Sequence, residues 1–102
     1  MSWPTHKYNA VRTELDGISF PSKAEARYYA QLKMAKAAGQ LVFFLRQVPI
    51  EIPGSKLVID FVEFWADGRI VWTEVKGMET PAYKNKKKAV ELLYPFKINQ
   101  VK

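Results

Sequence analysis

Apolar and polar residues are spaced in two ways along this chain, and the change between the two spacings predicts its elements. The dipeptide Asp16-Gly17, set between short β-compatible segments, predicts a hairpin. From Ser22 to about Ala38 the apolar spacing is helical, and Gly39 follows at the usual terminating position. One face of this helix carries Glu25, Tyr28, Tyr29 and Leu32, which recur at i, i+3, i+4 and i+7.

The second half of the chain predicts three strands, a second helix and a last short strand. The first strand consists of two extended segments, Leu41–Arg46 and Val48–Ile52, broken by Pro49. The other two strands are Leu57–Trp65 and Arg69–Lys76. Thr80 and Pro81 suit the N-cap and first helical positions of a helix that runs to about Leu93. Residues 97–101 form the last strand. This order predicts an α/β fold, a mixed β-sheet flanked by helices.

Length and charge limit the classes of protein to consider. The 102 residues correspond to a single domain, which we place at residues 10–102 after a flexible basic arm, residues 1–9. The formal charge of +6 predicts a polyanionic partner, and nucleic acid fits better than a membrane because no basic anchor or transmembrane run is present. The absence of cysteine excludes disulfides and Cys-based zinc sites. No secretory signal is found, so we expect a cytoplasmic setting.

Two acids in the middle of apolar strands are the main candidates for chemistry. Asp60 has aliphatic and aromatic neighbours, and Glu74 lies in the next strand, two places before Lys76. Burying a carboxylate costs several kcal/mol unless a cation or a hydrogen-bond partner compensates. Hard oxygen ligands without His or Cys indicate Mg²⁺ or Mn²⁺ rather than zinc. The alternative is that both acids are solvated residues of a half-exposed sheet.

The turn between the two strands decides whether the acids can meet. A two-residue loop would place Asp60 and Glu74 on opposite faces of the sheet. A three-residue loop, with Gly68 in the left-handed region, pairs Trp65 with Arg69 and sets the two acids directly across from each other. A shift of one residue would invert every side chain, so a shared site requires the three-residue loop. Regular alternation also places on one face Val58, Asp60, Val62 and Phe64.

Glu25 is open to two interpretations. It is the N3 acid of a capping box that begins at Ser22, and it is favourable there beside the helix dipole. It also heads the helical face that packs on the sheet, where a third carboxylate could reach a metal.

Basic residues form two groups that could contact phosphates. The second helix carries one group, which either follows a nucleic-acid backbone or is a solvated helix face. Its members are Lys84, Lys86, Lys87 and Lys88. A second group, near the start of the chain and of the first helix, contains Lys7, Arg12, Lys23 and Arg27.

The acids in this order resemble the catalytic core of the PD-(D/E)XK nuclease superfamily. The fuller pattern is similar to small phage-encoded nucleases related to archaeal-type Holliday junction resolvases. It consists of Lys7-Tyr8-Asn9-Ala10, Asp16-Gly17, Phe20-x-Ser22-Lys23-x-Glu25-Ala26, Asp60-Phe61 and Glu74-Val75-Lys76-Gly77. The resemblance extends from Lys7 to the last strand. Ile59 precedes Asp60, where the superfamily pattern has proline.

The resemblance implies a metal site and assigns a role to each residue near it. Asp60, Glu74 and the backbone carbonyl of Val75 would hold the metal, and Glu25 would act through the metal or its waters. Lys76 would orient the attacking water and offset phosphate charge. Two further matches are Gln47, at a glutamine often found near such sites, and Ser22, at an expected substrate contact together with Lys23.

The activity implied is that of a structure-selective endodeoxyribonuclease that uses Mg²⁺, with Mn²⁺ able to substitute. By this resemblance the substrate is a four-way DNA junction, cut during recombination by a phage protein in the host cytoplasm. No nucleotide cofactor and no membrane partner are expected. A homodimer is expected, since the junction has near two-fold symmetry. The alternatives are a nicking, repair or restriction-type endonuclease of the same fold, and a non-catalytic basic module that binds nucleic acid.

Overall fold

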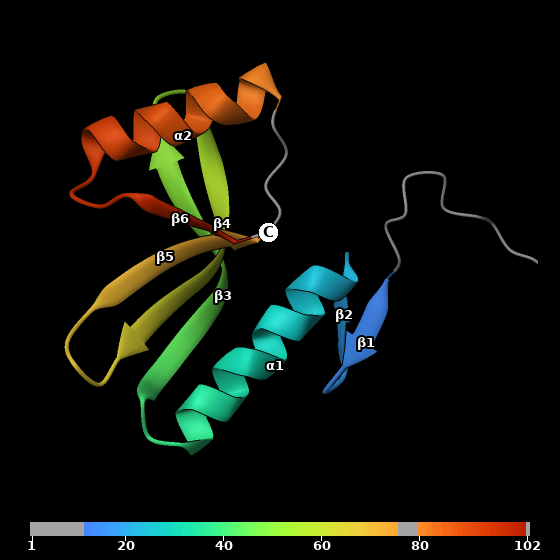
Figure 1. Ribbon diagram of the computed structural model, residues 1–102. Coiled ribbons are helices and arrows are strands. Elements are labelled where there is room, and N and C mark those ends of the chain that lie inside the picture. Colours follow the sequence, from blue (N-terminus) through green and yellow to red (C-terminus); the bar gives the residue numbers. More distant parts are fainter. Residues whose placement is uncertain (1–11, 76–79, 102) are drawn as a thin grey trace, which may run out of the picture.

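A computed structural model of the protein describes residues 12–75 and 80–101 (Figure 1). A four-stranded sheet has the strand order β3-β4-β5-β6, and β1 and β2 form a separate hairpin beside α1. Pairing in the sheet is antiparallel except between β5 and β6, which are parallel and connected through α2. The elements are β1 Thr13–Leu15, β2 Ile18–Phe20, α1 Lys23–Ala37, β3 Leu41–Ile52, β4 Ser55–Trp65, β5 Ile70–Val75, α2 Pro81–Leu93 and β6 Ile98–Val101. The predicted α/β class, with a mixed sheet and two helices, is confirmed.

The first helix begins as its sequence predicts. Asp16 and Gly17 both have positive φ, which suits the two-residue turn that pairs Leu15 with Ile18. The Ser22 hydroxyl accepts a hydrogen bond of 3.2 Å from the Glu25 backbone N–H, as an N-cap should. The helix therefore has a fixed start, and that start sets where the side chain of Glu25 lies relative to the sheet.

Strand β3 is one continuous strand of 12 residues, so the predicted break at Pro49 is wrong. Proline lacks a backbone N–H, but β3 is at the edge of the sheet, where one side of the strand needs no ladder bonds. The irregular residue is Gln47, whose φ is 52° in the left-handed region. A non-glycine residue with this backbone inside a strand is uncommon.

The turn between β4 and β5 has the three-residue form. The Trp65 N–H donates to the Arg69 carbonyl at 2.9 Å, and the Gly68 N–H donates to the Trp65 carbonyl at 3.0 Å. Gly68 has a φ of 95°, which residues with a Cβ rarely adopt. The same register pairs Phe61 with Thr73, so the residues one step further along face each other. These residues are Asp60 and Glu74, and the predicted register is confirmed.

Strand β4 contributes to two separate hydrophobic cores. Phe61 packs in the core beneath α1, whereas Ile59 and Val62 pack in the core beneath α2. In a regular strand Ile59 and Phe61, two residues apart, would share a face, whereas Ile59 and Val62, three apart, would not. The observed packing is the reverse, so the alternation is broken at Asp60. The prediction that Val58, Asp60, Val62 and Phe64 share one face is therefore wrong.

The physical reason for the break is the left-handed backbone of Gln47. By the β3–β4 register, in which Arg46 pairs with Phe61 and Val48 with Ile59, Gln47 stands opposite Asp60. An irregular residue at this point increases the local twist, so that the two faces of the paired strands exchange sides. Figure 1 shows the outcome, with α1 against one end of the twisted sheet and α2 against the other.

Candidate active site

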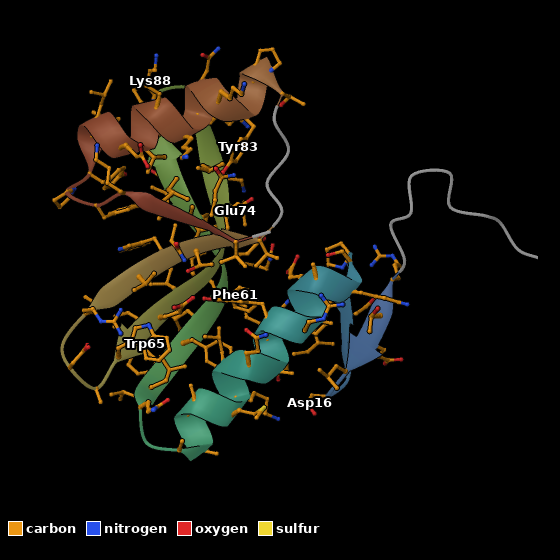
Figure 2. All side chains as sticks on the ribbon, viewed as in Figure 1. Asp16, Phe61, Trp65, Glu74, Tyr83 and Lys88 are labelled. Carbon is orange, nitrogen blue, oxygen red and sulfur yellow. The ribbon has the colours of Figure 1, made fainter. Side chains whose placement is uncertain are left out.

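Three carboxylates from three elements meet at the local twist of β3 and β4. Glu25 comes from the first turn of α1, Asp60 from the middle of β4 and Glu74 from the end of β5. Figure 2 shows Glu74 on β5, between the two helices in this view. Glu25 is only 4% exposed, although it is a charged residue on a helix.

Hydrogen bonds hold the three acids in one network. The Asp60 carboxylate accepts a bond of 2.9 Å from the Val75 N–H and one of 3.2 Å from the Gln47 side-chain amide. The same amide nitrogen donates to Glu25 Oε2 at 3.3 Å, so it joins two carboxylates that come from different elements. The Asp60 N–H donates to Glu74 Oε1 at 3.4 Å. The left-handed backbone of Gln47 thus places its side chain at the centre of the site.

Burial and mutual repulsion disfavour the charged forms of these acids. Burial raises the pKa of Glu25 to about 7, with a further increase from the charge of Asp60. The same two causes raise the pKa of Glu74 to about 7. Burial also raises the pKa of Asp60, against the hydrogen bonds from Val75 and Gln47. A proton or a cation at the site would therefore stabilise it.

Arg46 lies beside this cluster, and sequence reasoning missed it. Its guanidinium is 3.9 Å from Glu25 Oε2 and lies over the ring of Phe20, 4.7 Å from the ring centroid. It opposes the rise in the pKa of both Glu25 and Asp60. The sequence does hold a hint, because an arginine stands directly before Gln47 in a mainly apolar strand.

Glu63 forms a second buried polar group that sequence reasoning also missed. It is 1% exposed, and its two carboxylate oxygens accept bonds from the Tyr28 hydroxyl at 2.6 Å and the Trp65 indole N–H at 3.0 Å. Burial and this bond raise the pKa of Tyr28. Tyr28 is three residues after Glu25, so this network joins α1 to β4 one turn away from the acid cluster.

The predicted DNA-contacting lysines of α2 lie on different sides of the helix. Lys84 and Lys88 are exposed, and Figure 2 shows Lys88 on the side of α2 away from the sheet. Lys87 donates to the Gln100 side chain at 3.3 Å. Lys86 instead lines a pocket with residues of β3 and β4, namely Glu51, Ser55, Lys56, Leu57 and Val58. The four lysines therefore surround the outer part of the helix rather than form a single row.

The other predicted contacts gather near the start of α1 or lie outside the described residues. Lys23 is exposed at the first helical position, after the N-cap Ser22. Arg12 is exposed and donates to the Ser19 hydroxyl at 3.2 Å. Lys7 and the arm of residues 1–9 lie outside the part of the chain that is described, as does Lys76.

The donor chemistry of the cluster fits a hard divalent cation. Within residues 12–75 and 80–101, no set of three or more His, Cys, Asp or Glu side chains is arranged to hold a metal ion. As the side chains lie, the Gln47 amide joins Glu25 to Asp60. The donors themselves are carboxylate oxygens, which hard cations prefer, and burial followed by repulsion from Asp60 raises the pKa of Glu25 and Glu74. A change of side-chain rotamers would be needed to bring all three onto one ion.

Comparison with known families places the chain in a group defined by sequence. A family model described as "Protein of unknown function (DUF1064)" matches residues 5–101. The chain belongs to the DUF1064 family. The match includes all three acids of the cluster. The DUF1064 chain gave no match among curated proteins or among solved structures. Neither helix in the described part of this DUF1064 chain is long and apolar enough to span a membrane.

Proposed function

We propose that this DUF1064 protein is a metal-dependent endodeoxyribonuclease that hydrolyses phosphodiester bonds of branched DNA. The observation that supports the proposal best is the convergence of Glu25, Asp60 and Glu74 from three elements, where burial and then the charge of Asp60 raise the pKa of both glutamates to about 7. Such a cluster costs stability, so a protein that keeps it needs a cation or a protonated acid there.

The chain's own residues would divide the work in the following way. Asp60, Glu74 and the Val75 carbonyl would hold Mg²⁺ or Mn²⁺, with Glu25 at its edge. When bound, the cation supplies an activated water and screens the charge that develops on the phosphate. Gln47 fixes the orientation of two of the carboxylates through its amide.

Lys76 completes the proposed site. It directly follows Val75 in the chain. In the proposal it supplies fixed positive potential where negative charge grows on the phosphate. A side chain that stabilises developing charge contributes to the rate without any proton transfer of its own.

A DNA substrate accounts for the overall charge of +6 and for the exposed basic residues of α2 and of the α1 start. We propose the four-way junction as the preferred form, cut by a homodimer whose two-fold symmetry matches that of the junction. Exposed apolar side chains on β3 and β5 offer a face for the second copy. They include Phe43, Leu45 and Ile70, at 42%, 46% and 51% exposure. Light scattering at micromolar concentration should give twice the chain mass.

A second candidate function is that of a basic nucleic-acid-binding module without catalysis. It is favoured by the arrangement of the acids, since the described residues hold no ready-made metal cluster. In that case the acid cluster would only shape the sheet, and DNA binding would not depend on divalent cations.

One cleavage experiment separates these functions. Labelled four-way junction and linear duplex of the same sequence are incubated with Mg²⁺, with Mn²⁺ or with a chelator. The resolvase function predicts paired nicks in the junction that require the metal and disappear in Asp60→Asn. Cleavage of both DNA forms alike would favour a nicking or restriction-type endonuclease. Tight binding without any cleavage would support the binding module.

A further inference from the structure

We propose that Arg46 is a phosphate-binding residue of this site, whose guanidinium donates hydrogen bonds to non-bridging oxygens of the DNA backbone. This inference rests on the proposed function insofar as DNA is the ligand, but it does not require that the DNA be cut. Arginine suits such a contact because its planar fork of donors matches two phosphate oxygens.

The guanidinium is fixed in place before any ligand binds. Arg46 lies over the ring of Phe20, 4.7 Å from the centroid, and Phe20 is fully buried. Its backbone, on edge strand β3, pairs with Phe61 of β4. A cation held over an aromatic face on a paired strand loses little conformational freedom when a phosphate binds.

The donors of Arg46 are largely unused. The distance of 3.9 Å to Glu25 Oε2 is longer than a hydrogen bond, so the pair is electrostatic only. The Nε atom is buried and has no hydrogen-bond partner among the described residues. The side chain is 24% exposed, which leaves part of it accessible to a ligand. A fixed guanidinium with unused donors is incomplete without an oxyanion.

The charge of the site also calls for a cation at this position. Three carboxylates repel a phosphodiester, and a phosphate can approach them only where positive charge offsets the repulsion. The Arg46 guanidinium lies 3.9 Å from Glu25 Oε2, which places its positive charge directly beside the cluster. A phosphate bound by Arg46 would therefore lie at the edge of the acid cluster.

Arg69 provides a matched control at the far end of the β4–β5 hairpin. Like Arg46, it lies over an aromatic ring, that of Trp65 at 5.3 Å, and it pairs with a carboxylate. Unlike Arg46, it donates a hydrogen bond of 2.8 Å to Asp67, and its side chain is 61% exposed. Replacing either arginine with methionine removes one positive charge and keeps a long apolar stem.

The test measures binding of labelled duplex and four-way junction DNA with Ca²⁺ in place of Mg²⁺, at several salt concentrations. We expect Arg46→Met to weaken binding roughly tenfold and Arg69→Met less than about twofold, because charge-assisted contacts in a fixed geometry contribute most. Equal effects of the two substitutions would overturn the inference. Thermal unfolding confirms that each variant is folded. If Arg46→Met does not fold, Arg46→Gln replaces it, and wild-type affinity in that variant would also overturn the inference.

A double substitution separates phosphate binding from mere support of Glu25. If Arg46 acts only through Glu25, adding Arg46→Met to Glu25→Gln will not change DNA affinity further, and the inference fails. If Arg46 binds phosphate, the roughly tenfold loss persists in the Glu25→Gln background. Because binding is read without cleavage, a protein that never cuts DNA can still confirm the role of Arg46. Conversely, metal-dependent cleavage with normal binding by Arg46→Met would sink this inference and leave the nuclease proposal standing.

Discussion

Two acids lie three residues apart in β4, and their surroundings differ. Glu63 is buried on the α1 side, and both of its oxygens accept bonds from neutral donors, Tyr28 and Trp65. Asp60 also accepts two hydrogen bonds, but its neighbours include Glu25 and Glu74, whose pKa values its charge helps to raise. The two sites thus differ in the charge around them rather than in the number of bonds.

This difference indicates which buried acid is a candidate for chemistry. A carboxylate surrounded by neutral donors can stay buried as part of the packing, because each of its oxygens has a hydrogen-bond partner. A group of carboxylates that repel one another lowers stability, and a bound cation or protonation of one acid removes that cost. Burial of an acid is therefore weak evidence for function, whereas unbalanced charge is stronger evidence.

The largest expected effect comes from removing the charge of an acid of the cluster, compared with removing that of Glu63. Asp60→Asn and Glu74→Gln should abolish DNA cleavage, while the thermal midpoint stays constant or rises, because the relief of repulsion offsets the donor that Asp60→Asn leaves without an acceptor. Glu63→Gln should instead lower the free energy of unfolding by about 1–3 kcal/mol, because an amide leaves one donor of the network without an acceptor. Cleavage assays and thermal unfolding measure the two effects.

The control for this prediction is the folded fraction of Glu63→Gln. That fraction should retain metal-dependent cleavage at a rate close to that of the wild type. If Asp60→Asn cleaves as well as wild type, or if Glu63→Gln behaves like Asp60→Asn, the distinction between the two acids is wrong.

The next effect concerns pH. Folding raises the pKa of Glu25 and Glu74 from an ordinary value of 4.5 to about 7, so the folded state binds protons more tightly than the unfolded state. Their contribution to stability is present below pH 4.5 and is lost as the pH rises through 7. We expect the metal-free protein to lose on the order of 1 kcal/mol between pH 5 and pH 8, after allowance for solvent screening.

Denaturant unfolding at both pH values, with and without Mg²⁺, measures this change. Mg²⁺ should restore stability at pH 8 and have little effect at pH 5, where the acids are protonated. Glu74→Gln should flatten the dependence on pH. A pH profile of Glu74→Gln that matches the wild type would show that the acid cluster is not its cause.

A smaller effect should follow from changes at Gln47, which joins two of the acids. Its φ of 52° is tolerated by Asn but is costly for a β-branched residue. We expect Gln47→Val to lower the free energy of unfolding by about 1–3 kcal/mol. Gln47→Asn should keep most of the stability, but its shorter amide cannot reach both carboxylates, so cleavage should fall. Equal stability of the two variants would argue against the strained backbone.

The smallest effect concerns the exposed lysines of α2. Replacing Lys84 and Lys88 with glutamine should weaken binding to duplex and junction DNA alike, and reduce the salt slope by roughly 1 per lost phosphate contact. The matched control replaces Lys36 and Lys97, which are exposed on other parts of the chain. A salt slope that is unchanged, or that falls equally in both double variants, would assign Lys84 and Lys88 to a solvated helix face.

Much of the fold could be predicted from the sequence because its signatures are local. The Asp16-Gly17 turn, the Ser22 cap and the Gly68 turn each specify a backbone conformation within a few residues, and the register that sets Asp60 against Glu74 follows from the last of them. The metal, the DNA substrate, the dimer and the roles of the site residues stay predictions.

The features that were missed depend on contacts between distant segments. The left-handed backbone of Gln47 has no local signature, because glutamine rarely adopts it. Glu63 is buried only because packing brings the Tyr28 hydroxyl to it from α1. Arg46 gains its position from Phe20 in the hairpin, 26 positions earlier in the chain. Each of these required the tertiary structure.

Strand β4 contributes buried residues to both hydrophobic cores, and this affects how the protein unfolds. Because Ile59 packs beneath α2 and Phe61 beneath α1, separating either helix from the sheet exposes a residue adjacent to the other core. The two halves should therefore unfold together rather than as independent units. We therefore expect the amide hydrogens around Asp60 to exchange with solvent only when the whole domain opens, so that the acid cluster would stand on slowly exchanging backbone.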